Sequence, residues 1–273
     1  MKKILALVGV GLVSVCHAED ATFPTAILGQ GTMDAAFSVV SDSNSSIINF
    51  NGNPGRQSLD ITVESAQIRY GLGSDWHVGA RLAYRSEGVV RTDFSSPPGH
   101  FVDTTSEGRQ NPSLWASYGF INDKASPFSL SGTILVTPDT TGKQDSRYSG
   151  QLVAGWWSSD TLRLYGGYSV AAGRDRDTAD TSGISVGART YLSETVALIP
   201  SAGYTRYRAT DTYSSRTQYQ IGLSSRVRLM RNTYILPGVM LYRNSSGASK
   251  DGLFRRDATA NGRVLILEFY HLF

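Results

Sequence analysis

Hydrophobic and polar side chains alternate with a period of two residues along most of the chain. In LRLYGGYSV (162–170) the even-numbered positions are hydrophobic or glycine, while the odd-numbered positions carry arginine, tyrosine, glycine and serine. The segments WHVGARLAYRS (76–86) and FSLSGTILV (128–136) alternate in much the same way. Because successive side chains of a β-strand face opposite sides of a sheet, this pattern predicts strands with one apolar face.

Segments of this kind recur along the chain without a domain break. We expect strands at residues 31–40, 58–72, 76–86, 112–120, 127–137, 148–158, 161–171, 183–192, 195–207, 216–229, 233–243 and 262–273. Short turns, such as 73–75 and 192–194, alternate with long polar stretches, such as 91–110 and 243–261. This layout predicts an all-β fold, a single antiparallel up-and-down transmembrane β-barrel of about 12 strands, an even number typical of bacterial outer-membrane barrels.

Aromatic residues near the strand ends favour a membrane barrel over a soluble β-sandwich, which would show the same alternation. In a bilayer, such residues form girdles at the two interfaces with water. We expect the girdles to include Trp76, Tyr84, Tyr118, Phe120, Phe128, Tyr148, Trp156 and Tyr204.

Composition agrees with many short strands joined by turns. Hydrophobic residues make up 40% of the chain and charged residues 18%, with 28 glycines and 14 tyrosines. The formal net charge of +3 lacks the strong basic excess of a nucleic-acid-binding protein. We therefore expect no nucleic-acid partner.

The first residues resemble a secretory signal peptide. Lys2 and Lys3 precede an apolar stretch at 4–15, and small residues precede Glu19. We expect cleavage after Ala18, which divides the chain into a signal peptide (1–18), a short N-terminal segment (19–30) and the barrel (31–273). The one cysteine, Cys16, would leave with the signal peptide, so we expect no disulfide and no thiolate metal site.

The chain ends in GRVLILEFYHLF (262–273). Outer-membrane barrels commonly end in an aromatic residue with apolar residues at alternate positions before it, and this run is similar to theirs. The resemblance implies an assembly signal at Phe273, Phe269 and Leu267 that the barrel assembly machinery recognises, with His271 as a mild departure. It also implies integral placement among outer-membrane lipids and lipopolysaccharide, while the signal peptide predicts export through the general secretory pathway.

A narrower resemblance covers roughly residues 60–145. AQIRYGLGSDWHVGARLAYR (66–85) and NPSLWASYGFINDKASPFSLSGTILVTPDTTG (111–142) resemble hairpins of the transporter-like barrels known as the meta-pathway phenol-degradation family. This resemblance implies passage of small solutes, aromatic compounds among them, across an outer membrane.

Strand parity also predicts which residues face the interior. An arginine facing lipid at the bilayer midplane would cost about 2 to 4 kcal/mol, so the arginines of the strands should point inward. The expected pore-lining residues are Arg69, Arg81, Arg85, Arg163, Tyr165, Arg189, Gln220, Arg226, Arg228 and Glu268. Reconciling the parity of strand 58–72 requires a β-bulge near Ser65.

Two interpretations of this interior remain open. Small inward residues, namely Gly167, Ser169, Gly187, Ser129 and Ser131, would leave space for an open pore that favours anions. Alternatively, the arginines could form ion pairs with Asp34, Glu64 and Glu268 in a filled interior.

We expect no enzyme, metal or cofactor. A lipase or protease of this class needs a serine–histidine or aspartate–histidine arrangement, and the contexts of His77, His100 and His271 lack one. Asp175, Asp177 and Asp180 offer oxygen ligands, but the rest of a calcium loop is missing.

The predicted function is a porin-like channel for small solutes, aromatic or anionic compounds among them. The alternatives are a non-conducting structural or adhesion barrel and a lipid-modifying enzyme.

Overall fold

The structure is a computed structural model that describes residues 23–95, 98–104, 107–122, 126–140, 146–174, 178–258 and 261–273. The predicted signal peptide lies outside the described residues. No helix in these ranges is long and apolar enough to cross a membrane.

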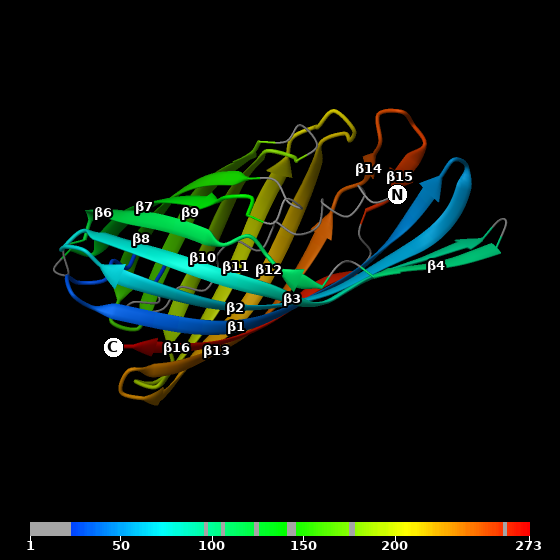
Figure 1. The fold of residues 1–273 in the computed structure, drawn as a ribbon. Helices are drawn as coiled ribbons and strands as arrows, with labels where there is room; N and C mark the ends of the chain where they lie inside the picture. The colour runs from blue at the N-terminus through cyan, green and yellow to red at the C-terminus, as the bar shows by residue number, and fades with distance from the viewer. Residues whose placement is uncertain are drawn as a thin grey trace.

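The described residues form strands and connecting turns (Figure 1). The strands are β1 (Met33–Phe50), β2 (Asn53–Gly71), β3 (Trp76–Ser95), β4 (Pro98–Thr104), β5 (Gly108–Arg109), β6 (Ser113–Ile121), β7 (Phe128–Thr137), β8 (Arg147–Ser159), β9 (Leu162–Gly173), β10 (Thr181–Tyr191), β11 (Val196–Tyr207), β12 (Arg216–Met230), β13 (Thr233–Asn244), β14 (Gly247–Ala248), β15 (Phe254–Arg256) and β16 (Asn261–Leu272).

Twelve of the described strands close into an antiparallel barrel, which confirms the predicted fold class. Each pairs with the next in the order β1, β2, β3, β6, β7, β8, β9, β10, β11, β12, β13 and β16, and β16 pairs again with β1. The backbone N–H of Phe273 donates to the carbonyl of Met33 over 2.8 Å. The last residue therefore completes the closure, which removes the free edges that a sheet could not expose to hydrocarbon.

The two ends of the barrel differ, as the sequence predicted. Tight connections such as 72–75 and 160–161 lie at the end that also holds Met33 and Phe273, which we call the turn end. Longer connections, such as 208–215 and the described part of the β13–β16 connection at 245–258, lie at the opposite end, which we call the loop end.

The first hairpin is longer than the sequence pattern suggested. We expected strands at 31–40 and 58–72, but β1 and β2 pair without interruption up to Phe50 and Asn53. Asn51 and Gly52 have φ values of 51° and 83°, which fits a two-residue turn of the type that joins hairpin strands. The polar stretch 91–110 likewise contains strand, because β4 pairs with the end of β3.

These extended strands form a projection at the loop end, which we call the wing (residues 45–58, 87–95 and 98–104). Figure 1 shows the β1–β2 and β3–β4 hairpins reaching together beyond the barrel. The short β14–β15 hairpin adds to the wing, since β15 pairs with β1 from Ile48 to Phe50.

The predicted bulge near Ser65 is absent from β2, whose register with β1 is unbroken. The irregularity lies in β3, where Ser86 is the extra residue between Arg85 and Glu87. Leu59 and Ile61 therefore do face inward, and they form a buried apolar cluster with Val90. The break in the alternation of β2, from which a bulge was predicted, is therefore an apolar patch on the inner wall.

The outer face carries the expected aromatic girdles. At the turn end, the rings of Trp76 and Tyr118 lie 4.6 Å apart, and Phe128 stacks on Trp156 at 6.3 Å. At the loop end, Tyr204 and Tyr219 form a pair at 5.1 Å. Between these rings, exposed Leu, Ile and Val side chains form the apolar surface.

Candidate functional site

The N-terminal segment 23–32 lies inside the barrel at the turn end. Phe23 is only 1% exposed, and its ring packs on the inward side chains of Val153, Tyr165 and Ile199. These partners come from β8, β9 and β11, so the segment reaches across the interior.

Two arginines of the inner wall hold the Phe23 ring. The guanidinium carbon of Arg163 lies 4.5 Å from the ring centroid, and that of Arg189 lies 5.7 Å from it. A cation over an aromatic face is attracted by the ring quadrupole, more strongly where water is excluded. Phe23 therefore helps to accommodate two positive charges inside the barrel.

Hydrogen bonds fix the rest of the segment to other strands. The hydroxyls of Thr25 and Ser129 lie 2.7 Å apart, and the hydroxyl of Ser131 donates to the carbonyl of Pro24 over 3.4 Å. The backbone N–H of Leu28 donates to Nδ1 of His77 over 3.4 Å. The segment is thus fixed at the turn end of the interior through contacts with both β3 and β7.

Small inward residues accommodate these groups, and the expectation that they leave open space is wrong at several positions. A β-carbon at Gly187, one of the residues expected to leave space, would lie 2.3 Å from the Tyr165 ring. Gly155, which was not in that set, likewise has no room for one, because a β-carbon there would lie 2.6 Å from the Phe23 ring. Ser129 and Ser131 bond to the segment, as described above. Of the small residues singled out from the sequence, Ser169 is exposed.

The ten expected pore-lining residues all lie on the inward face by the alternation of their strands, but their burial differs. Arg69, Tyr165, Arg189, Arg226 and Glu268 are buried. Arg81, Arg85, Arg163, Gln220 and Arg228 are partly exposed. The second group has the larger surface that water can reach.

Arg69 forms the center of a buried polar cluster with Asp34. Its Nη2 lies 2.5 Å from Oδ2 of Asp34, and the two side chains are 3% and 2% exposed. The hydroxyl of Tyr270 donates to the same carboxylate over 2.7 Å. Glu268 lies close enough to act electrostatically on both Arg69 and Arg81. This part of the wall fits the filled-interior alternative.

One of the acids proposed for that alternative lies elsewhere. Glu64 falls on the outer face of β2, with the exposed Ala66 and Ile68, because the strand has no bulge. It therefore cannot pair with the inward arginines.

Aromatic rings and carbonyls hold other inward arginines. Arg226 lies 4.1 Å from the ring centroid of Tyr234, and Arg163 lies 3.0 Å from that of Trp157. Nη2 of Arg228 donates to the carbonyl of Glu194 over 2.6 Å.

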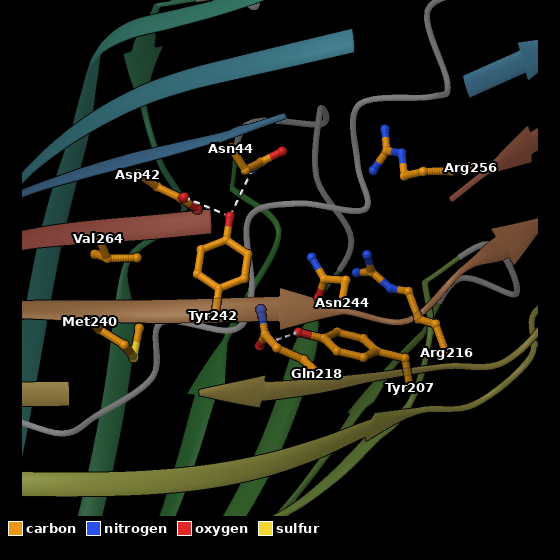
Figure 2. Close-up of a pocket in the computed structure, with 10 residues that line it drawn as sticks. All are labelled: Asp42, Asn44, Tyr207, Arg216, Gln218, Met240, Tyr242, Asn244, Arg256 and Val264. Atoms are coloured by element: carbon orange, nitrogen blue, oxygen red, sulfur yellow. Dashed lines mark hydrogen bonds between the residues drawn. The ribbon is translucent and has the colours of Figure 1, made fainter. Parts of the chain in front are cut away.

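A second group of inward residues surrounds a narrow pocket at the loop end, with a volume of about 20 Å³ (Figure 2). Its lining comes from six strands and consists of Asp42, Asn44, Tyr207, Arg216, Gln218, Met240, Tyr242, Asn244, Arg256 and Val264. The predicted set of pore-lining residues contains none of them. The inward parity of β12, extended to Arg216, was the one available signal.

The three histidines of the described residues lie in separate parts of the fold. His77 is buried against the N-terminal segment, and His100 bonds to Asp93 on the exposed wing. His271 lies on the outer face with its Nδ1 2.9 Å from the hydroxyl of Thr233. No metal-binding group of His, Cys, Asp and Glu occurs in the described ranges, and Asp175 and Asp177 lie outside them.

The proposed assembly signal lies on the outer face at the turn end. Phe273, Phe269 and Leu267 are 62%, 43% and 37% exposed. Their side chains therefore contribute little to the packing of the interior. Their role in assembly stays a prediction.

We expect deletion of Phe273 to reduce the amount of assembled barrel far more than His271→Ala does. The terminal aromatic side chain is the feature shared with outer-membrane barrels, whereas His271 departs from their pattern. The measurement is the fraction of protein that migrates as a compact form in detergent gels until it is boiled. Equal assembled fractions for the two variants would contradict the assembly role.

Comparison with known proteins places the fold. No family model matches the chain, and no curated protein sequence is similar to it. The COG4313 outer membrane channel from Pseudomonas putida F1 superposes with a TM-score of 0.58 at 14% identity, covering 92% of this chain and 98% of that one. The translocator domain of the autotransporter NalP from Neisseria meningitidis gives 0.51 at 14% identity over 89% of each chain. The NanC porin gives 0.50 at 7% identity over 86% and 98%. The chain therefore has the fold of outer-membrane β-barrels.

Proposed function

We propose that the protein is an outer-membrane channel for small solutes, closed at its turn end by its own N-terminal segment. The observation that carries this proposal is the separate segment 23–32, which packs against the inner wall at the turn end. A scaffold would need only the side chains of the wall there. All the barrel strands pair with one another without it. Displacing the segment would therefore open the interior without breaking the barrel.

The structural comparisons support a channel-like role. An outer membrane channel and a porin are among the proteins that share the fold. The resemblance of residues 60–145 to the meta-pathway phenol-degradation family supports small aromatic compounds as solutes.

The same proposal predicts the orientation of the protein in the membrane and its partners there. The turn end would face the periplasm, and the wing would face the outside of the cell. The apolar outer face would contact outer-membrane lipids and lipopolysaccharide. The C-terminal run would engage the barrel assembly machinery after export through the general secretory pathway.

The partly exposed arginines of β3 support a preference for anions. Arg81 and Arg85 both face inward, and each has a buried Nε without a hydrogen-bond partner among the described residues. Nη2 of Arg85 lies 3.5 Å from Oε1 of Gln110, at the limit of a hydrogen bond. Positive charge at such positions raises the local concentration of anions.

We expect the combined substitution Arg81→Gln and Arg85→Gln to shift the reversal potential of the open channel toward cations. The measurement is made in a planar bilayer with a salt gradient, and the shift should shrink at high salt because screening is stronger there. This conductance experiment is also the test of the channel function itself.

The matched control is Arg206→Gln with Arg243→Gln, which removes the same charge from two exposed positions on the outer face. The control should leave the reversal potential unchanged. Equal shifts in both pairs would show that the inner wall does not set selectivity.

A non-conducting barrel is the second candidate, and the buried ion pair of Arg69 and Asp34 favours it. In that case no conductance would appear with or without the N-terminal segment. The channel proposal predicts conductance at least when the segment is displaced.

A further inference from the structure

The narrow pocket at the loop end holds two guanidinium groups that enter from different elements. Arg216 begins β12, and Arg256 ends β15, the short strand that folds back onto β1. In Figure 2 both side chains lie on one side of the pocket, opposite Asp42 and Tyr242. The two guanidinium groups lie close enough together for the charge of Arg216 to act on that of Arg256.

The one acid that lines this pocket already has partners. The hydroxyl of Tyr242 donates to Oδ1 of Asp42 over 2.7 Å, and Nδ2 of Asn44 donates to the Tyr242 hydroxyl over 2.8 Å. Asp42 is therefore held on the far side of the pocket by a tyrosine and an asparagine.

Arg256 has no carboxylate within ion-pair distance among the described residues. Its Nη2 donates to Oε1 of Gln57, and its buried Nε has no hydrogen-bond partner in the part of the chain described. Burial, followed by the charge of Arg216, lowers the pKa of Arg256 to about 10. The group is thus still protonated at neutral pH, and it keeps donor capacity for a further partner.

The chemistry of the lining selects an anion. Two converging guanidinium groups present several N–H donors, and charge-assisted hydrogen bonds to an oxyanion are about twice as strong as neutral ones. The volume of about 20 Å³ suits one small group and excludes a whole molecule. The phenol ring of Tyr207, 4.1 Å from the guanidinium carbon of Arg216, fixes that side chain in place.

We propose that the pocket between Arg216 and Arg256 binds the oxyanion group of a small organic acid, while the rest of the molecule stays in the barrel interior. This inference rests on the proposed channel function and names the chemical class of its solute. The pocket acts as the first binding point for an anion that enters from the loop end.

The test is equilibrium dialysis of radiolabelled benzoate against the refolded full chain in neutral-detergent micelles at low salt. Benzamide, which has the same ring and no charge, should bind far more weakly. Arg256→Gln should reduce benzoate affinity by roughly tenfold or more, the loss expected for one charge-assisted hydrogen bond. Arg255→Gln is the matched control, because Arg255 is its neighbour in the chain with a side chain 71% exposed. It should change the affinity little.

A second variant keeps the test decisive if Arg256→Gln fails to fold. Asp42→Asn removes the negative charge of the pocket, so benzoate should bind several-fold more tightly. Unchanged affinity in this variant, or equal losses for the Arg255 and Arg256 substitutions, would overturn the proposed site.

Competition identifies the source of the oxyanion. Acetate should displace benzoate, and displacement by phosphate but not by acetate would overturn the assignment to an organic acid. Dialysis requires no conductance, so binding by a barrel that never conducts would reject the channel and keep the site. Conductance without benzoate binding would keep the channel proposal and reject the binding site.

Discussion

A disulfide between Thr25→Cys and Ser129→Cys should hold the barrel closed, and reducing that disulfide should raise its conductance. The two hydroxyls lie 2.7 Å apart, between the N-terminal segment and the inner face of β7. Two sulfur atoms at these positions are near enough to reach bonding distance with small adjustments. The one native cysteine, Cys16, lies in the predicted signal peptide, so the introduced pair would be the only one in the mature chain.

The physical reason is that the segment is held by weak, separable contacts. Phe23 provides the main apolar anchor, while Thr25 and Leu28 add hydrogen bonds to the wall. A covalent bond at Thr25 removes the open states that thermal motion would otherwise allow. Deleting residues 23–28 should have the opposite effect, with high conductance that does not respond to reductant.

The matched control places a disulfide in the wall. Ser38 and Ser65 face each other across β1 and β2, with their hydroxyls 2.8 Å apart. Cysteines at these two positions should form a disulfide that leaves the segment free, and conductance should not depend on its redox state. If the Thr25–Ser129 pair gave equal conductance when oxidised and reduced, the segment would not be the gate.

The barrel itself could be predicted because its physical cause is local. Alternation in segments such as 162–170 reflects a wall with lipid on one side, and that constraint acts on each strand separately. The strand ends that extend beyond the bilayer could not be predicted, because no lipid constrains their outer face. Residues 41–57 carry serine, asparagine and glycine, since strands beyond the bilayer need no apolar outer face. Only Asn51 and Gly52 marked the hairpin there.

The contents of the barrel could not be predicted, because they depend on contacts between distant residues. Thr25 and Ser129 form a hydrogen bond although they are 104 positions apart in the sequence, and Tyr242 and Asp42 form one although they are 200 positions apart. Parity gave the inward direction of each arginine but not its neighbours. Arg69 and Arg81 both face inward on the neighbouring strands β2 and β3. Among the described ion pairs, however, only Arg69 takes part in a buried one, whereas Arg81 is partly exposed.

Replacing Arg69 by Met should lower the free energy of unfolding by about 3 to 5 kcal/mol, because it leaves a buried carboxylate without its cation. Asp34 is 2% exposed, and among the side chains that the structure describes Tyr270 alone would remain to donate to it. The measurement is unfolding in urea of the refolded barrel. Replacing both partners, Arg69 by Met and Asp34 by Leu, should recover most of the loss, since an apolar pair of similar size often substitutes for a buried ion pair.

The exposed ion pair of Arg91 and Asp60 provides the comparison. Its charged atoms lie 2.8 Å apart, but the side chains are 46% and 35% exposed. Arg91→Ala should therefore lower the free energy of unfolding by only about 0 to 1 kcal/mol. A similar small change for Arg69→Met would mean that water reaches Asp34 in the folded barrel. The interior would then be open near β1 and β2, where the structure buries Arg69 and Asp34.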